Sequence, residues 1–347
     1  MPVEDPIPEY RELESRILAA MGPDLGEERF NDLALEVHAF QRRRNRPYAA
    51  FAATRPMPRT WREIPAVPQA AFKQASLTCI PEGRCEVTFR TSGTTGETRG
   101  THFFFDTTLY DASILRSWQS LRLPQLRQVI FAPHPKEAPH SSLSHMFATL
   151  AAEGNGLQTW CCDAEGRLDL ARVSSVLRTA ETSGPFLLLG TALAFLHLFD
   201  SLAPGEHRLA GSIALETGGY KGSGRDIPKA ELYARFNTHL GIPADDVINE
   251  YGMTELSSQF YSRGLGAVHT GPPWMKAIVI DPETEVEVPI GEPGILRIFD
   301  LANLNSCLAL DTQDLAIRRQ NGFELLGRIP NAAPRGCSRA ADEMMRR

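Results

Sequence analysis

The sequence predicts an α/β fold built on a parallel or mixed β-sheet. Short apolar segments alternate with segments of helical periodicity from residue 106 to residue 248. Helices of this length between strands require right-handed crossovers, which place the strands in one sheet. Strands are expected at residues 129–131, 157–160, 186–189, 213–215 and 247–248, and helices at residues 106–121, 141–150, 168–177, 191–202 and 228–240.

The composition narrows the functional classes. The 347 residues are 42% hydrophobic and 22% charged, as expected for a globular protein of one large domain or two. A net charge of −6 argues against a broad nucleic-acid surface. No apolar run has the length of a membrane span, and the N-terminus lacks a basic region followed by an apolar one, so a cytoplasmic location is expected. Six cysteines without C-x-x-C spacing predict neither a zinc site nor a disulfide framework.

The N-terminal part is expected to be helical and then irregular. Leu33, Val37 and Phe40 recur at i, i+4 and i+7 within a helical segment at residues 8–45. Five prolines between residues 47 and 68 predict an irregular connection on the surface. The side chains expected to anchor that connection are Trp61, Ile64 and Phe72.

A loop rich in glycine and hydroxyl side chains follows the first predicted strand at residues 86–89. The loop, from Thr91 to Thr101, contains three glycines and Arg99. Glycines let backbone N–H groups approach a ligand closely, and hydroxyls and arginine donate to phosphate oxygens. Thr98 stands where a Walker A loop starting at Gly93 would need glycine, so that motif is excluded. A phosphate-binding loop of another kind is favoured over a plain hairpin turn.

Two further loops follow strands, where ligands bind in such sheets. At residues 216–222, a Gly-Gly pair before Tyr220 suits a flat heterocycle, although a plain strand-to-helix turn is an equal interpretation. At residues 249–255, Glu255 offers hard oxygens for Mg²⁺ and Thr254 offers a hydroxyl near phosphate. Taken alone, Glu255 is also compatible with a salt-bridged surface acid.

Together these motifs resemble a known superfamily. Thr91–Gly96 and Tyr251–Glu255 resemble the two best-known motifs of the adenylate-forming enzymes: acyl-CoA synthetases, luciferases and peptide-synthetase adenylation domains. The resemblance covers about residues 60–347 and implies layered mixed β-sheets with flanking helices. Further matches are Gly291–Gly294, Asp311–Leu315 with Gln313 in place of the family's glycine, and Gly327-Arg328.

Within that superfamily the chain resembles the LuxE-type acyl-protein synthetases. The sequence ends nineteen residues after Arg328, so the usual C-terminal lid domain with its catalytic lysine is expected to be absent. In this subfamily a cysteine near the C-terminus accepts the acyl group as a thioester, and Cys337 stands at that place. The matching segments are Ile64–Pro68 with Phe72-Lys73, Ser141–Leu143, Thr217–Gly219 and Pro334–Ser338.

The resemblance also implies residue roles, with ATP and Mg²⁺ as cofactors. The catalytic residues it implies are Cys337, Thr254, Glu255 and Arg99, with Glu255 as the metal ligand. Arg99 replaces the family's usual lysine. The nucleotide-binding residues it implies are Thr91, Ser92, Gly93, Thr94, Thr95, Gly96 and Gly100 for the phosphates; Gly218, Gly219 and Tyr220 for adenine; Asp314 and Arg328 for ribose; and Glu250, Tyr251 and Gly252 of the second motif. The acyl-pocket residues it implies are Ser142, His145 and Met146.

Four segments are expected along the chain. They are an N-terminal helical and wrapping segment (1–78), an α/β core with the nucleotide loop (79–290), a small β-rich subdomain (291–332) and a C-terminal tail with Cys337 (333–347).

The expected function is ATP-dependent activation of a carboxylic acid, followed by transfer to the Cys337 thiol. The acyl group would pass to a partner such as an acyl reductase, a carrier protein or another acceptor; neither nucleic acid nor a membrane span is expected. One alternative is a ligase that passes acyl-AMP directly to CoA, a carrier-protein thiol or an amine, with Cys337 idle. A non-enzymatic alternative is a degenerate nucleotide-binding scaffold, which Arg99, Gln313 and the short C-terminus keep open.

Overall fold

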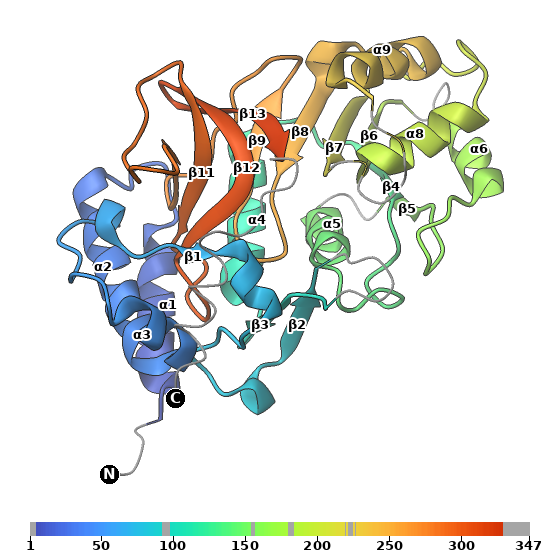
Figure 1. The fold of residues 1–347 in the computed structure, drawn as a ribbon. Helices are drawn as coiled ribbons and strands as arrows, with labels where there is room; N and C mark the ends of the chain where they lie inside the picture. The colour runs from blue at the N-terminus through green and yellow to red at the C-terminus, as the bar shows by residue number, and fades with distance from the viewer. Residues whose placement is uncertain are drawn as a thin grey trace. The chain divides into compact units, whose positions relative to one another are not determined.

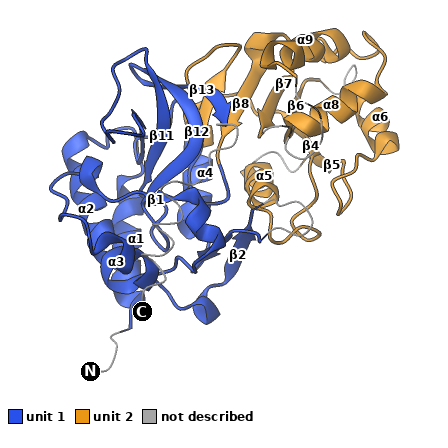
Figure 2. Cartoon of the chain, viewed as in Figure 1, with its two compact units in different colours: residues 1–117, 253–259, 269–347 blue, residues 118–252, 260–268 orange. Residues whose placement is uncertain are grey.

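The chain divides into two compact units, shown in different colours in Figure 2. The computed structural model describes residues 5–91, 98–153, 157–179, 184–218, 220, 225 and 227–328. Unit 1 comprises Met1–Ser117, Met253–Gln259 and His269–Arg347, and unit 2 comprises Trp118–Gly252 and Phe260–Val268. Within the second sequence motif, the chain therefore passes from unit 2 to unit 1 between Gly252 and Met253. The four-segment division expected from the sequence stays a prediction.

Unit 2 is built on a six-stranded sheet with the order β5-β4-β6-β7-β8-β9 (Figure 1). The neighbouring strands are parallel except for β9, which pairs antiparallel with β8. The predicted parallel or mixed sheet is therefore confirmed. Its strands are β4 Arg127–Phe131, β5 Gln158–Trp160, β6 Phe186–Thr191, β7 Ile213–Thr217, β8 Val247–Tyr251 and β9 Phe260–Arg263.

Helices cover both faces of this sheet. Val129 and Phe131 of β4 share a core with α6, α8 and α9, whereas Gln128, on the opposite face, donates to the Leu150 carbonyl of α5 at 3.1 Å. The two layers of helix match the predicted alternation of strands and helices. The helices are α5 Ser142–Glu153, α6 Leu170–Arg178, α8 Ala192–Ser201 and α9 Lys229–Leu240, with the short 3-10 helix η4 Ala244–Asp246 before β8.

Strands β7 and β8 extend further than the sequence predicts. Glu216 and Thr217, predicted to begin a loop, are the last residues of β7, and Asn249, Glu250 and Tyr251 complete β8. The prediction ended both strands at their last apolar residue. Parallel pairing continues through Thr217 opposite Glu250, and polar partners from unit 2 compensate the burial of the carboxylates.

Unit 1 contains a twisted sheet with the order β1-β12-β11-β10, in which β13 also pairs with β12. A separate hairpin, β2–β3, carries the glycine-rich loop at its tip. The strands are β1 Val67–Pro68, β2 Val87–Arg90, β3 Thr101–Phe104, β10 Met275–Ile280, β11 Pro293–Asp300, β12 Ala309–Arg319 and β13 Gly322–Arg328.

The N-terminal segment forms three helices instead of one continuous helix. Pro23 lacks a backbone N–H and follows Gly22, so the helix predicted at residues 8–45 is interrupted between α1 and α2. Figure 1 shows these helices beside the sheet of unit 1, with which α1 and α2 share a core. The helical elements are α1 Ile7–Ala20, α2 Glu27–Arg44, α3 Arg46–Ala52, α4 Thr108–Ser120, η1 Trp61–Glu63, η2 Gln69–Lys73 and η3 Glu82–Arg84.

The connection after α3 is anchored as predicted. Trp61, Ile64 and Phe72 are all buried. Trp61 packs edge-on against Phe299 of β11, with ring centroids 4.8 Å apart. Among the described residues, no helix combines the length and the apolar character that crossing a bilayer requires.

Candidate functional site

The β2–β3 hairpin closes the base of the predicted phosphate loop. The Thr91 N–H donates to the Gly100 carbonyl at 2.9 Å, and the Gly100 N–H donates to the Thr91 hydroxyl at 2.8 Å. A Cβ on Gly100 would lie 3.1 Å from Cγ2 of Thr91, so a larger residue there would require Thr91 to shift. Arg99, next to it, is exposed. The predicted residues Ser92, Gly93, Thr94, Thr95 and Gly96 lie outside the described residues.

His102 connects this hairpin to the second motif. Its Nδ1 donates to the backbone carbonyl of Thr254 at 2.8 Å. Burial lowers the pKa of His102 to about 4, opposed by that hydrogen bond, so the ring is neutral at physiological pH. Phe72 of η2 packs edge-on against His102, with centroids 5.5 Å apart. The base of the phosphate loop and Thr254 are therefore held together inside unit 1.

Glu255 belongs to a chain of polar contacts that reaches the two predicted ribose residues. Gln69 Nε2 donates to Glu255 Oε1 at 3.1 Å, and Arg328 donates to the Oε1 of Gln69 at 3.2 Å. The Nε of Arg328 in turn lies 3.4 Å from Asp314 Oδ1. Three residues predicted separately from the sequence are thus brought together through Gln69.

A β-bulge sets the position of Arg328. The pairing of β12 with β13 shifts register after Leu315, so that Leu326 is the extra residue of β13 and Gly327, with φ of 117°, follows it. After this shift, Arg328 lies directly opposite Asp314. In the Gly327-Arg328 pair noted in the sequence, the glycine thus lies at the irregularity of the strand and the arginine faces Asp314.

Two buried residues support Glu255 from the sheet side of unit 1. Asn303 Nδ2 donates to the Glu255 carbonyl at 2.9 Å, and its Oδ1 accepts from the Ser257 hydroxyl at 3.2 Å. Asp300 accepts from the Ser257 N–H at 2.8 Å and from the Ser258 hydroxyl at 2.7 Å. Burial outweighs these hydrogen bonds and raises the pKa of Asp300 to about 6. The loop after Thr254 is therefore fixed by buried hydrogen bonds.

Within unit 2, a second set of predicted residues lies at the carboxyl ends of β7 and β8. The Thr217 hydroxyl donates to Oε2 of Glu250, its cross-strand partner. Gly218 follows β7 with φ of 71°, in the left-handed region that favours glycine. Tyr251 is buried and packs near Phe260 of β9, with ring centroids 6.3 Å apart.

A second carboxylate, Glu216, lies on the opposite face of the same sheet. Tyr233 donates its hydroxyl to Glu216 Oε1 at 3.1 Å, and Lys229 Nζ lies 3.7 Å from the same oxygen. Lys229 also donates to Asn249 Oδ1 at 2.7 Å. Burial raises the pKa of Glu216, and the lysine and tyrosine oppose that shift. Glu216, Tyr233 and Asn249 are buried, whereas the Lys229 side chain is 40% exposed, so the network reaches the surface at the lysine.

The remaining predicted residues divide between described and undescribed parts of the chain. Ser142 begins α5, Met146 is buried on that helix, and His145 is half-buried. Gly252 and Tyr220 are half-buried. Gly219 and Cys337 lie outside the described residues.

The sequence matches a protein-family model over most of its length. A model described as "AMP-binding enzyme" matches residues 59–299, which is more than half of the chain. The chain belongs to the AMP-binding enzyme family. The predicted adenylate-forming fold, with layered mixed sheets and flanking helices, is therefore confirmed.

Solved structures share the fold of this AMP-binding enzyme at low sequence identity. ATP-bound MatB from Rhodopseudomonas palustris is 18% identical over 70% of this chain and 48% of its own, with a TM-score of 0.52. The 2-hydroxyisobutyryl-CoA ligase in complex with 2-HIB-AMP and CoA is 15% identical over 88% and 70%, with a TM-score of 0.64. The luciferase-like enzyme from the mealworm Zophobas morio is 14% identical over 71% and 58%, with a TM-score of 0.52. The chain thus spans about half the length of MatB. No curated protein sequence matches it.

The donor set of this AMP-binding enzyme fits a magnesium ion that arrives with a nucleotide. Across the described ranges, no group of three or more His, Cys, Asp or Glu side chains is arranged to hold a metal ion. Glu255 supplies one carboxylate, which is 3% exposed and oriented by Gln69. Mg²⁺ keeps several waters and binds through one or two carboxylates plus phosphate oxygens, so a single glutamate is sufficient.

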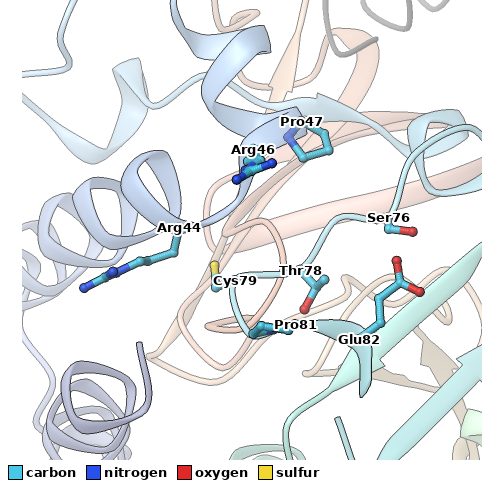
Figure 3. A pocket seen from close by; sticks show the side chains of 8 residues that line it. All are labelled: Arg44, Arg46, Pro47, Ser76, Thr78, Cys79, Pro81 and Glu82. Carbon is cyan, nitrogen blue, oxygen red and sulfur yellow. The ribbon is translucent and has the colours of Figure 1, made fainter. Parts of the chain in front are cut away.

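One hollow of unit 1 lies apart from the predicted site residues. This cavity of about 240 Å³ lies between the α2–α3 junction and the segment from Ser76 to Glu82 (Figure 3). Several of its polar groups already have partners within the chain: Arg44 pairs with Glu9 at 3.3 Å, and Thr78 donates to the Ile80 carbonyl at 2.6 Å. The cavity is lined by none of the residues predicted to bind the nucleotide or the carboxylic-acid substrate.

Four residues that hold the predicted site residues or their loop in place were missed by the sequence interpretation. Asp300 and Asn303 are two of several polar residues between Ile295 and Leu310, so the local sequence does not mark them as buried hydrogen-bonding groups. Gln69 lies inside a segment that carries the family resemblance, but its contacts are not visible in the sequence. His102 directly follows the predicted phosphate loop, and nothing in its local sequence indicates a contact with Thr254.

We expect the buried Glu250 to make the stability of the AMP-binding enzyme depend on pH. Burial, with a smaller effect from Glu216, raises the pKa of Glu250 from 4.5 to about 7, opposed by Thr217. Between these values the folded state holds the proton that the unfolded state releases, so the free energy of unfolding falls as pH rises. Glu250→Gln should remove this dependence. The change in the free energy of unfolding that it causes should be more favourable at pH 8 than at pH 5 by up to ~3 kcal/mol.

Urea unfolding of Glu250→Gln and wild type at pH 5 and pH 8 measures this difference. Glu137→Gln is the matched control, because Glu137 is exposed in the same unit and should leave the pH dependence unchanged. If Glu250→Gln changed the stability equally at pH 5 and pH 8, the Glu250 carboxyl would be ionised in the folded protein at both pH values.

Proposed function

We propose that the protein uses ATP to convert a carboxylic acid into an acyl-adenylate and then transfers the acyl group to a thiol. The substrate carboxylate oxygen bonds to the α-phosphorus of ATP, and pyrophosphate leaves with the electron pair of the broken P–O bond. A thiolate then attacks the acyl carbonyl carbon, and AMP leaves. We further propose that the thiolate is Cys337, as in LuxE-type acyl-protein synthetases, and that the protein acts in the cytoplasm.

One observation carries the adenylation step: the continuous chain of contacts from Glu255 through Gln69 to Arg328 and Asp314. The chain joins a carboxylate suited to a metal–phosphate group with two polar side chains suited to ribose hydroxyls. His102 holds the backbone beside Glu255 against the strand that closes the phosphate loop. These groups support recognition of both the phosphate and the ribose parts of one nucleotide.

The residues act mainly by alignment and by charge. Backbone N–H groups and hydroxyls of the loop from Thr91 to Gly100, with Arg99, would hold the β- and γ-phosphates. Thr254 would contact the α-phosphate, and Asp314 and Arg328 would accept and donate hydrogen bonds at the ribose. Preorganised donors of this kind stabilise the charge that develops on the leaving pyrophosphate.

Adenine would lie at the end of β7. Gly218 is exposed there, and apart from its chain neighbours no atom of the described residues lies within 4 Å of a Cβ built on it. Gly219, Tyr220 and the motif residues Glu250, Tyr251 and Gly252 would complete this part of the nucleotide site. Ser142, His145 and Met146 of α5 are proposed for the acyl pocket.

Glu255 would hold Mg²⁺ together with the phosphate oxygens of ATP. When bound, the ion neutralises phosphate charge and orients the phosphates. The chain's own contribution is to fix the Glu255 carboxylate, through the amide of Gln69 and through the hydrogen bond from Asn303 to its backbone.

A second candidate differs only in the acyl acceptor. The 2-hydroxyisobutyryl-CoA ligase structure contains both 2-HIB-AMP and CoA, and McyG was solved as an A-PCP unit with phenylalanyl-adenylate. With such acceptors, acyl-AMP would pass directly to CoA or a carrier-protein thiol, and Cys337 would be idle. A downstream acyl reductase is the partner proposed for the Cys337 route.

Intact mass spectrometry after a carboxylic-acid screen distinguishes transfer to Cys337 from direct transfer to CoA or a carrier-protein thiol. The screen measures pyrophosphate release with fatty, aromatic and amino acids, and the best acid is then incubated with protein and ATP. Cys337→Ala should retain ATP–pyrophosphate exchange within about twofold of wild type, since the first step does not use the thiol. The variant should lose the acyl adduct that wild type forms.

Cys85→Ala is the matched control, because Cys85 is a half-buried thiol of unit 1 that no proposed step uses. It should keep both exchange and adduct. An adduct that persists in Cys337→Ala, or none in wild type despite exchange, would favour the direct-transfer candidate. Absence of exchange with every acid would contradict adenylation itself.

A further inference from the structure

We propose that Gln69 is a positioning residue that couples the phosphate end of the nucleotide site to the ribose end. Its Nε2 donates to Glu255 Oε1 at 3.1 Å and its Oε1 accepts from Arg328 at 3.2 Å. Gln69 therefore contacts both Glu255 and Arg328, two residues predicted to bind the nucleotide. This inference deepens the proposed function and rests on it.

The amide is chemically suited to this place. An amide carries a donor and an acceptor at one tip, and here the donor meets a carboxylate and the acceptor meets a guanidinium. The two partners also decide which tip atom is nitrogen, because the reversed amide would face each partner with like polarity. A glutamate would place a second negative charge beside Glu255, and a leucine would offer neither hydrogen bond.

The backbone around Gln69 is fixed without help from its side chain. Val67 and Pro68 pair in parallel with Leu310 and Asp311 near the start of β12. This pairing places Gln69 beside the part of β12 that contains Asp314. Phe72, three residues later, is buried against His102. The Gln69 side chain is itself only half-buried. Its substitution should therefore alter the bridge and leave the fold intact.

Calorimetric titration of ATP and 3′-deoxy-ATP, each with Mg²⁺, tests the coupling. In wild type, loss of the ribose hydroxyl should weaken binding by about tenfold, as expected for a hydrogen bond to a charged group. In Gln69→Leu, ATP should bind about tenfold more weakly, because Glu255 and Arg328 are no longer held. The penalty for 3′-deoxy-ATP should then shrink to less than about threefold, since Arg328 contributes less.

Gln74→Leu is the matched control, because Gln74 is exposed at the end of the same 3-10 helix. It should match wild type in both titrations and in melting temperature. Gln69→Glu, which is nearly isosteric, should weaken ATP binding as Gln69→Leu does, and it carries the same test if the leucine variant does not fold.

The outcomes separate the role of Gln69 from the proposed function. If wild type binds ATP, and both Gln69 variants show the same ATP affinity and the same ribose discrimination as wild type, the positioning role alone is overturned. Weaker ATP binding with undiminished ribose discrimination would overturn the coupling. If wild type binds no ATP, the proposed function and the role of Gln69 are both overturned.

Discussion

Glu255→Gln should lower carboxylate-dependent ATP–pyrophosphate exchange by about 10²-fold or more. The substitution removes one negative charge and keeps the shape of the side chain. Glu255 is 3% exposed, and its backbone carbonyl is held by Asn303 at 2.9 Å, so the loop should keep its conformation. The loss should therefore reflect weaker stabilisation of the metal–phosphate charge and not a change of fold.

Exchange assays at saturating ATP, with melting temperatures measured in parallel, check this expectation. Glu283→Gln is the control, because Glu283 lies exposed in the β10–β11 connection of the same unit. It should exchange at the wild-type rate. If Glu255→Gln exchanged as fast as this control, Glu255 would have no part in the chemistry.

Asn303→Ala should lower the free energy of unfolding by about 2–4 kcal/mol, because it leaves several buried polar groups without a partner. The side chain is 1% exposed. It donates to the carbonyls of Glu255 and Cys307 at 2.9 and 2.8 Å, and accepts from Ser257 at 3.2 Å. Exchange at a temperature well below the melting point should also fall, since the Glu255 loop loses its support.

Urea unfolding compares Asn303→Ala with Asn321→Ala. Asn321 is exposed at the β12–β13 turn, so its truncation should change stability by no more than about 0.5 kcal/mol. Similar stability for the two variants would mean that the hydrogen bonds of Asn303 contribute nothing net. Lower stability with unchanged exchange would mean that the Glu255 loop does not depend on Asn303.

Much of the fold follows from local sequence patterns. The strand at Val129–Phe131 and the helix that ends near Leu240 were recognisable from a short apolar run and from helical periodicity. The ends of β7 and β8 were not, because Glu216 and Glu250 look like loop residues. Their burial depends on partners that the fold brings close, such as Tyr233 and Thr217.

The site was predictable as two motifs but not as an assembly. The resemblance of two separate segments to the family implied roles for Glu255 and Asp314, and these roles stay predictions. The contacts that place them join residues far apart in the chain: Gln69 lies 186 residues from Glu255, and His102 lies 152 residues from Thr254. No local propensity encodes such pairs, because they arise from the parallel β1–β12 pairing and the hairpin packing.

A crystal structure of the protein with Mg²⁺ and a non-hydrolysable ATP analogue tests the central claim most directly. We expect the β- and γ-phosphates against the loop between Thr91 and Gly100, the metal on Glu255, and the ribose hydroxyls beside Asp314 and Arg328. A nucleotide bound elsewhere, or phosphates that contact neither that loop nor Glu255, would contradict the account.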